Sequence, residues 1–282
     1  MAEPDAGTLL LGVVGHPVRH SLSPAIQNAA LRHDGRNAIY LAFEVAPDNF
    51  EVFVEGMRAA GVRGLNVTLP HKRAAFDVCT TVTEEAQWTE AVNTMTFEGE
   101  EVVGDNTDIE GVRKTLLELG AELDGAKILV IGAGGAGRAA ARASMGSAGE
   151  IWIANRTPAR AEKLRGSVGR AARVIPWKEL ADAAVEADVI VHTTSVGLSE
   201  SETVLKRETL EKSKCKVLLD LVYGPGETKL VLEARGAGIR AADGLAMLVL
   251  QGAEAYVTFW DTSAPVEVMR QAALDAVGRA EP

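Results

Sequence analysis

The chain has 282 residues, 47% of them hydrophobic and 24% charged, which is ordinary globular usage and leaves room for two domains of about 150 residues. Its 39 acidic and 29 basic residues give a formal net charge of −10, which disfavours nucleic acid and anionic membranes as partners. No apolar run approaches the roughly 18 residues that span a membrane, and the acidic segment 1–7 lacks the zones of a signal peptide. A cytoplasmic location is therefore expected.

Metal chemistry and serine hydrolysis are not indicated. The two cysteines, Cys79 and Cys215, lie far apart with no cysteine or histidine at metal-ligand spacing, so we expect two reduced, buried thiols. The five histidines show no ligand spacing such as His-Glu-x-x-His. The sequence also has no Gly-x-Ser-x-Gly elbow of a serine hydrolase.

The first third of the chain alternates short apolar segments with segments of helical spacing. Strands are expected at 9–14, 39–45 and 64–69, helices at 24–32 and 49–60, and a hairpin from 94–97 and 101–103. Such alternation predicts a mostly parallel sheet. We therefore expect an N-terminal α/β unit over residues 1–108.

The same alternation continues in the rest of the chain. Strands are expected at 127–131, 151–154, 173–175, 189–191 and 217–221, and helices at 108–119, 135–145, 158–165, 228–235, 245–260 and 266–277. This predicts a Rossmann-type unit over 109–243 and an α/β fold of two domains with a cleft between them. By pattern alone the last helices, over 244–282, are ambiguous, and the break at Asp243-Gly244 permits their return to the first unit.

A dinucleotide-binding fingerprint follows the strand 127–131 and precedes an alanine-rich helical segment. It consists of Gly132, Ala133, Gly134, Gly135, Ala136 and Gly137. In this pattern the first glycine makes the tight turn, the second admits the pyrophosphate, and the third lets the helix pack on its strand. The free N–H groups at the helix start then bind the phosphates.

The next strand ends at Asn155-Arg156-Thr157, where NAD enzymes usually place an acidic residue for the ribose 2′-hydroxyl. Here Arg156 and Arg160 stand instead, and an arginine can bind a 2′-phosphate with two donors. The sequence therefore predicts NADP. The alternative is that both arginines are solvated residues of a helix start.

Two serines follow the first strand, in the segment 15–24. Ser21 and Ser23 are two residues apart, so on extended backbone both hydroxyls point the same way and could bind a small carboxylate. Ser23 precedes Pro24 and is therefore also expected as a helix N-cap. Both functions are compatible, because a helix N-terminus favours an anion.

Further polar residues gather where the third strand ends and at later turns. Asn66 and Thr68 share one face of that strand, Pro70 ends it, and Lys72 follows at the edge where open α/β sheets bind ligands. Taken alone, Lys72 is an ordinary surface lysine. The segments 91–94 and 104–108 add polar residues that turn formation and helix capping also explain.

Taken together, these segments resemble the shikimate/quinate dehydrogenase family, whose shikimate dehydrogenases interconvert 3-dehydroshikimate and shikimate. The resemblance covers 12–260 and is specific because the motifs occur in order. Its motifs are 15–24 with Asn28, 66–72, 91–94, 104–108, 132–137, 155–157, Thr194-Ser195-x-Gly197, Asp220-x-x-Tyr223 and 243–251.

The resemblance implies roles for individual residues. Lys72 and Asp108 would be the catalytic pair. The substrate would be bound through its carboxylate by Ser21, Ser23 and Tyr223, and through its ring hydroxyls by Thr68, Asn93, Asp108 and Gln251. The cofactor would be bound by Gly132, Gly134, Gly135, Ala136, Gly137, Asn155, Arg156, Thr157, Arg160, Thr194, Gly244 and Met247. The resemblance also implies that the final helices return to the substrate domain.

Four positions depart from the usual family pattern. Gln27 stands for a histidine, Glu90 for a glycine, His192-Thr193 for Asn-Ala, and Ala246 for a glycine. None of these removes a catalytic group. His192 and Ala246 lie in segments that the resemblance assigns to the nicotinamide side.

The implied activity is NADP-dependent, reversible reduction of 3-dehydroshikimate to shikimate, in aromatic amino-acid (chorismate) biosynthesis. Three alternatives stay open: a quinate/shikimate dehydrogenase using NAD, an aminoshikimate dehydrogenase, and a non-catalytic NADP-binding regulatory module. The sequence leaves both a monomer and a homodimer open.

Overall fold

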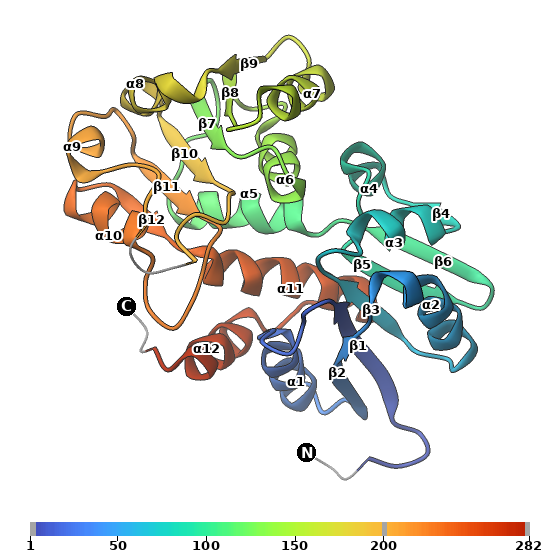
Figure 1. The fold of residues 1–282 in the computed structure, drawn as a ribbon. Helices are drawn as coiled ribbons and strands as arrows, with labels where there is room; N and C mark the ends of the chain where they lie inside the picture. Colours follow the sequence, from blue (N-terminus) through green and yellow to red (C-terminus); the bar gives the residue numbers. More distant parts are fainter. Residues whose placement is uncertain (1–3, 199–201, 280–282) are drawn as a thin grey trace. The chain divides into compact units, whose positions relative to one another are not determined.

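The computed structural model describes residues 4–198 and 202–279, so what was expected of residues 1–3 and 280–282 lies outside the described residues. The chain divides into two compact units. Unit 1 comprises Met1–Thr107 and Val249–Pro282, and unit 2 comprises Asp108–Leu248. Each unit contains one sheet with helices packed on it (Figure 1), so the predicted α/β class is confirmed.

The sheet of unit 1 has six strands in the order β2-β1-β3-β5-β6-β4. The strands are β1 (Leu9–Gly15), β2 (Ala38–Glu44), β3 (Gly64–Val67), β4 (Thr81–Val82), β5 (Thr94–Glu98) and β6 (Glu101–Asp105). β1 runs parallel to β2 and β3, whereas β5 runs antiparallel to β3. β5 and β6 form the hairpin that the sequence predicts, with Glu98 opposite Glu101. The sheet is therefore mixed.

Helices cover this sheet because their apolar side chains repeat on one face. They are α1 (Ser23–His33), α2 (Phe50–Ala59), α3 (Lys72–Val78), α4 (Glu84–Thr89), α12 (Val266–Val277) and the later part of α11 (Gly244–Trp260). Phe50 and Val54 lie one turn apart on α2 and are buried with Val14, Leu65 and Met95 of the sheet. α1 packs against α12, which brings the end of the chain back to its beginning.

The sheet of unit 2 is parallel throughout. Its strands are β7 (Lys127–Ile131), β8 (Glu150–Ala154), β9 (Ala172–Ile175), β10 (Val189–His192), β11 (Val217–Asp220) and β12 (Arg240–Ala242). Counted from the start of the unit, their order is 3-2-1-4-5-6, which is that of the Rossmann fold. The strand order reverses between β7 and β10, the place where such sheets bind ligands. The predicted Rossmann-type unit is thus confirmed.

Two layers of helices enclose the parallel sheet (Figure 1). One contains α5 (Asp108–Glu118), α6 (Gly135–Ser144) and α7 (Pro158–Val168), and the other contains α8 (Leu180–Glu186), α9 (Arg207–Leu210) and α10 (Lys229–Gly236). The strands read as continuous apolar runs because both faces are covered, and Ile128, Leu129, Val130 and Ile131 are all fully buried.

Glu90, which stands for a usual family glycine, ends α4 in the left-handed conformation (φ 50°, ψ 40°). Glycine adopts this region without steric cost, whereas another residue loses roughly 1–2 kcal/mol. The carboxylate of Glu90 lies 3.4 Å from the guanidinium of Arg73. The chain therefore keeps a turn of the kind that glycine favours, although a side chain is present.

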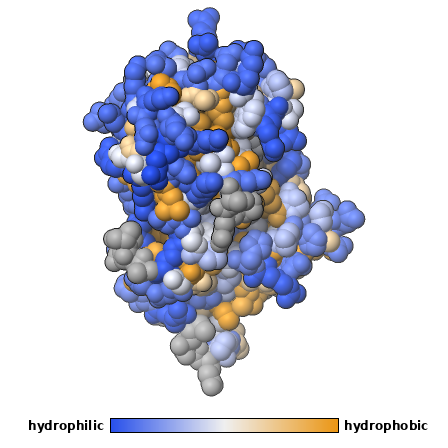
Figure 2. All heavy atoms as spheres, turned by 60° about the vertical axis from the view of Figure 1, so that its left-hand side comes forward, coloured by the Kyte–Doolittle hydropathy of each residue, from blue (hydrophilic) through white to orange (hydrophobic). Residues whose placement is uncertain are grey.

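The surface is largely hydrophilic on the face drawn in Figure 2, where apolar residues occur as separate patches. Within residues 4–198 and 202–279, no helix has both the length and the apolar character needed to cross a bilayer. Both cysteines are free; Cys215 is buried as predicted, whereas Cys79 is only partly buried. Burial raises the pKa of each thiol to about 12, so both thiols are protonated at neutral pH.

Candidate functional site

In unit 1, the segments that follow β1 and β3 lie against each other. β1 and β3 are parallel, with Val14 opposite Val67, so the segments that follow these two strands leave the sheet at the same edge. The amide of His16 donates to the carbonyl of Leu69 at 3.0 Å. A Cβ on Gly15 would lie 2.5 Å from Cγ2 of Thr68, so glycine permits this close approach. The serine segment after β1 and the segment from Thr68 to Lys72 therefore share one edge of the sheet.

The two serines have different surroundings. The hydroxyl oxygen of Ser21 accepts the amide N–H of Ser23 at 3.2 Å, a local bond that the sequence did not reveal. The predicted N-cap role of Ser23 is wrong, because α1 begins at Ser23 itself and Leu22 occupies the cap position. In the described part of the chain, the hydroxyls of Ser23 and Thr68 bond no other side chain. Both side chains are half-buried, and the described fold gives neither hydroxyl a structural role.

A buried hydrogen-bond network follows on the same edge. Asn93 donates from Nδ2 to Oγ1 of Thr107 at 3.0 Å and to Oε1 of Gln251 at 3.4 Å, and its Oδ1 accepts the amide of Thr107 at 2.8 Å. Its carbonyl accepts the amide of Val67 at 2.7 Å, which joins the network to β3. Asn93 and Gln251, which are far apart in sequence, are thus brought together.

Lys72 is the first residue of α3, a helix that the sequence analysis missed. Its carbonyl accepts the amide of Val92 at 2.9 Å, which connects it to the segment leading to Asn93. The preceding His71 is buried, stacks on Phe50 with ring centroids 4.7 Å apart, and donates from Nε2 to the carbonyl of Val45 at 2.8 Å. Burial lowers the pKa of His71, so its ring is neutral and holds the start of α3 in place.

In unit 2, the glycine turn between β7 and α6 has the geometry that the fingerprint predicts. Gly132 has φ +120°, and a Cβ there would lie 2.3 Å from Oγ1 of Thr193. A Cβ on Gly137 would lie 2.4 Å from the carbonyl oxygen of Gly132, so α6 packs directly on the turn. A Cβ on Gly134 or Gly135 would meet no atom of the described residues within 4 Å. The fold therefore needs the first and last glycines, whereas the middle ones leave open space before the start of α6. In Rossmann folds, a glycine turn of this kind before a helix start is where a pyrophosphate binds.

The residues predicted to read the cofactor's 2′-position follow β8, the strand beside β7. Asn155 donates from Nδ2 to the carbonyl of Thr157 at 2.9 Å, which shapes the turn into α7. Arg156, Thr157 and Arg160 are exposed, and neither guanidinium forms an ion pair with any described residue. Both arginines are therefore available to an anion.

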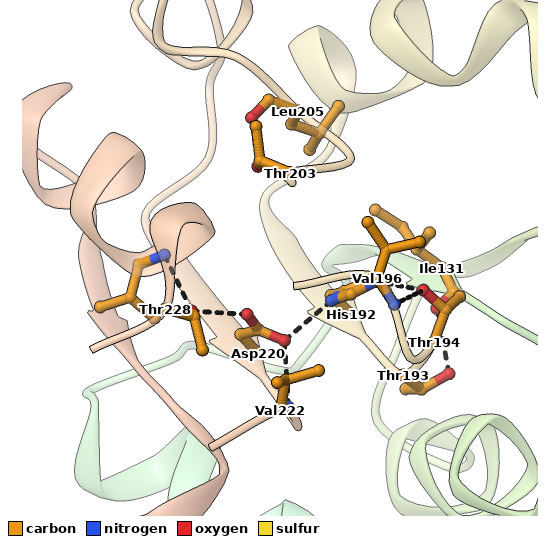
Figure 3. Close-up of polar contacts among 11 residues, drawn as sticks. Ile131, His192, Thr193, Thr194, Val196, Thr203, Leu205, Asp220, Val222 and Thr228 are labelled. Carbon is orange, nitrogen blue, oxygen red and sulfur yellow. Dashed lines mark hydrogen bonds and ion pairs between the residues drawn. The ribbon is translucent and has the colours of Figure 1, made fainter. Parts of the chain in front are cut away.

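The ends of β10 and β11 contain a buried polar chain that the sequence analysis did not find (Figure 3). His192 and Asp220 lie opposite each other on the two strands, with Nδ1 of His192 2.8 Å from Oδ1 of Asp220. Tyr223 follows three residues after Asp220 and is half-buried, and burial raises the pKa of its hydroxyl, which is therefore a neutral hydrogen-bond donor. In the sequence, the sign of these hydrogen bonds was that His192 departs from asparagine, the usual family residue.

The other predicted site residues of unit 2 lie at helix starts. Asp108 is the first residue of α5 and is 9% exposed. Gly244 begins α11, where its amide donates to the carbonyl of Val222 at 2.9 Å and a Cβ would lie 2.3 Å from the carbonyl oxygen of Leu221. Met247, one turn later, is half-buried. Within residues 4–198 and 202–279, no group of three histidine, cysteine or acidic residues is placed to bind a metal.

Comparison with known proteins agrees with these features. Family models match three consecutive stretches of the chain. They are the shikimate dehydrogenase substrate binding domain over residues 13–95, shikimate/quinate 5-dehydrogenase over 114–223, and the shikimate 5′-dehydrogenase C-terminal domain over 244–274. The chain is 41% identical over 280 residues to the shikimate dehydrogenase (NADP(+)) of Methanopyrus kandleri, and the alignment covers 96% of this chain and 97% of that one.

Two solved structures illustrate the similarity in three dimensions. The shikimate 5-dehydrogenase of Thermus thermophilus, in complex with NADP(H) and shikimate, has a TM-score of 0.86 at 37% identity, covering 95% of this chain and 99% of that one. The quinate dehydrogenase of Corynebacterium glutamicum, in complex with NAD, also has a TM-score of 0.86, at 28% identity with coverages of 95% and 99%. The resemblance noted in the sequence is therefore confirmed, and the chain belongs to the shikimate dehydrogenase family.

Proposed function

We propose that the protein is an NADP-dependent shikimate dehydrogenase, an oxidoreductase that reversibly reduces the C3 ketone of 3-dehydroshikimate to the alcohol of shikimate. The observation that carries this is the 41% identity, over nearly the whole chain, to a relative named as that enzyme. The glycine turn and the exposed Arg156 and Arg160 support a phosphorylated dinucleotide, and the hydroxyl and amide groups of unit 1 support a small polar substrate. The pathway, chorismate biosynthesis, and the cytoplasmic location remain predictions.

NADPH, when bound, supplies the hydride, and the protein supplies binding, orientation and proton transfer. The N–H groups at the start of α6 would bind the pyrophosphate in front of Gly134 and Gly135. Arg156 and Arg160 would bind the 2′-phosphate, with Asn155 and Thr157 shaping that turn. Thr194, Gly244 and Met247, which follow β10 and begin α11, would contact the nicotinamide. Unit 2 (109–243 in the sequence prediction) would thus be the NADP-binding domain.

The substrate groups find matching partners among the remaining residues. Ser21, Ser23 and the Tyr223 hydroxyl are neutral donors suited to a carboxylate. Thr68, Asn93 and Gln251 present hydroxyl and amide groups to the ring hydroxyls, and Asp108 presents a carboxylate. Residues 1–108, completed by the final helices, would therefore form the substrate domain.

Lys72 and Asp108 would carry the proton transfer. The Lys72 ammonium donates a proton to the carbonyl oxygen as it is reduced, and in the reverse direction the Lys72 amine accepts the hydroxyl proton. A positive charge beside the developing alkoxide also stabilises it, by roughly 3 kcal/mol for a single preorganised donor. Asp108 follows Thr107 directly, and the amide of Thr107 is held by Asn93. We assign Asp108 the role of orienting Lys72 and binding the adjacent ring hydroxyl.

The two kinds of glycine in the turn are expected to respond differently to alanine. Gly137→Ala places a Cβ against the backbone of Gly132, so it should lower the melting temperature. Gly135→Ala meets no protein atom, so it should leave the melting temperature unchanged while weakening NADPH binding. Thermal unfolding and calorimetric titration measure the two effects. Equal NADPH affinity in Gly135→Ala and the unchanged protein would contradict the phosphate site.

The activity itself is tested by reduction of NADP+ at 340 nm with shikimate, quinate and aminoshikimate side by side, each repeated with NAD+. The proposal expects the largest kcat/KM with shikimate and NADP+. Higher kcat/KM with quinate and NAD+ would instead identify a quinate dehydrogenase. This pair is included because the chain is also similar to the quinate dehydrogenase of Corynebacterium glutamicum, solved with NAD. No turnover with any pair would support the regulatory module.

A further inference from the structure

His192 lies at the end of β10 with its side chain 1% exposed, and it bonds on both sides of its ring (Figure 3). Nδ1 is 2.8 Å from Oδ1 of Asp220, and Nε2 is 2.5 Å from Oγ1 of Thr194. Asp220 is itself fully engaged, since Oδ1 accepts the amide of Val222 at 3.1 Å and Oδ2 accepts the hydroxyl of Thr228 at 2.6 Å. A buried chain of hydrogen bonds therefore runs from Thr228 to Thr194.

The chemistry of the Asp220 carboxylate fixes the direction of the first bond, and the form of the imidazole ring sets that of the second. The Asp220 carboxylate only accepts, so Nδ1 of His192 must carry a hydrogen and donate it. In the neutral imidazole, Nε2 then accepts the hydrogen of the Thr194 hydroxyl. The Thr194 oxygen also accepts the amide N–H of Val196 at 3.3 Å. Among the bonds that the described residues form, the single hydrogen of this hydroxyl is thus used, and one lone pair of its oxygen is left.

This hydroxyl lies where the parallel sheet binds ligands. His192 stands opposite Ile131, the last residue before the glycine turn, and Thr193 donates its hydroxyl to the carbonyl of Ile131 at 3.0 Å. The turn at Gly132 is packed against the same threonine. Thr194 is half-buried beside this turn, so its remaining lone pair can meet a ligand bound at the reversal of strand order.

We infer that His192 is a positioning residue that makes Thr194 a hydrogen-bond acceptor for a donor on the cofactor, the carboxamide N–H2 of the nicotinamide. This rests on the proposed function. An asparagine, the usual family residue, would reach Asp220 but is too short to reach Thr194 as well. The Thr194 hydroxyl would then be free to turn and donate. His192 therefore sets the polarity of this contact, which a merely space-filling side chain would not do.

The test compares two cofactors that differ in this donor. NADP+ carries the carboxamide, whereas its 3-acetylpyridine analogue replaces the NH2 group with a methyl group. The unchanged protein should bind NADP+ roughly tenfold more tightly than the analogue, or about 1.4 kcal/mol. In His192→Asn and in Thr194→Val this preference should fall to about twofold. The double variant should show the same preference as each single variant, because one interaction is lost only once. Thr194→Ser, which keeps the hydroxyl, should retain the preference.

The outcomes separate this inference from the proposed function. If the unchanged protein does not bind NADP+ in calorimetric titration, the proposed function and the inference both fail. If it binds NADP+ and His192→Asn keeps the full preference, only the inference is overturned. Affinity losses of equal size for both cofactors would likewise overturn it, because they would show a structural role. Melting temperatures of all variants show whether each one is folded.

Discussion

Replacing Lys72 by alanine is expected to lower kcat for shikimate oxidation by about 10²- to 10⁴-fold, the usual contribution of a general acid or base. The KM for shikimate should change little, because the substrate's carboxylate and ring hydroxyls are assigned to other residues. Lys72 begins α3, whose start is held by the buried His71, so the loss of this side chain should not disturb the helix. Steady-state kinetics at saturating NADP+ measures the effect.

Two control variants make this result specific. Arg73→Ala removes the neighbouring cation, which pairs with Asp77 at 2.9 Å, and should leave kcat within about twofold, since exposed ion pairs contribute little. Lys72→Arg keeps a positive charge, but a guanidinium does not give up its proton near neutral pH, so kcat should stay low. If Lys72→Ala retained nearly full kcat, the catalytic assignment would be wrong, although the cofactor assignment could stand.

Arg156→Ala is expected to lower the ratio of kcat/KM for NADP+ to that for NAD+ by about 10- to 100-fold. Hydrogen bonds to charged groups contribute roughly 1.5–3 kcal/mol, and each 1.4 kcal/mol corresponds to a factor of ten. The loss should fall on NADP+, because NAD+ has no 2′-phosphate. Arg156 is exposed and forms no ion pair with a described residue, so its removal should not affect the melting temperature.

Arg165 provides the matched control, on the helix α7 (Pro158–Val168) that follows Arg156. Its Nε lies 2.7 Å from Oε2 of Glu162, one turn earlier on α7, so its charge is already paired. Arg165→Ala should leave the cofactor ratio unchanged. An unchanged ratio in Arg156→Ala as well would show that the 2′-phosphate is bound elsewhere, with Arg160→Ala as the next variant to measure.

Much of the fold was predictable because the sequence patterns that indicate its strands and helices lie within short segments. The strands β7, β8, β10 and β11 of unit 2 are mainly apolar runs bounded by turn residues, and the glycine turn fixes which strand begins the Rossmann order. The short elements were not predicted, because a local pattern needs more residues than they contain. α3 has seven residues and β12 has three, too few for a periodic pattern to stand out. Which strands pair, and that α12 packs on α1, depends on contacts between distant segments.

The candidate site was predictable to the extent that single motifs carry it. Gly132 and Gly137 indicate their turn, and Arg156 predicts a 2′-phosphate because it stands where NAD enzymes place an acidic residue. The buried bonds of His192 with Asp220 and Thr194 were not predictable, because they join two strands whose pairing the sequence does not state. Ser23 shows the converse error, since the sequence has a strong capping pattern there but the helix begins one residue earlier.

The proposed function depends on hydride transfer between NADP and the substrate's C3, a step that isotope transfer follows atom by atom. 3-Dehydroshikimate is incubated separately with NADPH deuterated at each of the two C4 positions of the nicotinamide, and the shikimate formed is analysed by mass spectrometry. We expect one deuterium in shikimate from one of the two cofactors and none from the other. Shikimate free of deuterium with both cofactors, or no shikimate at all, would contradict it.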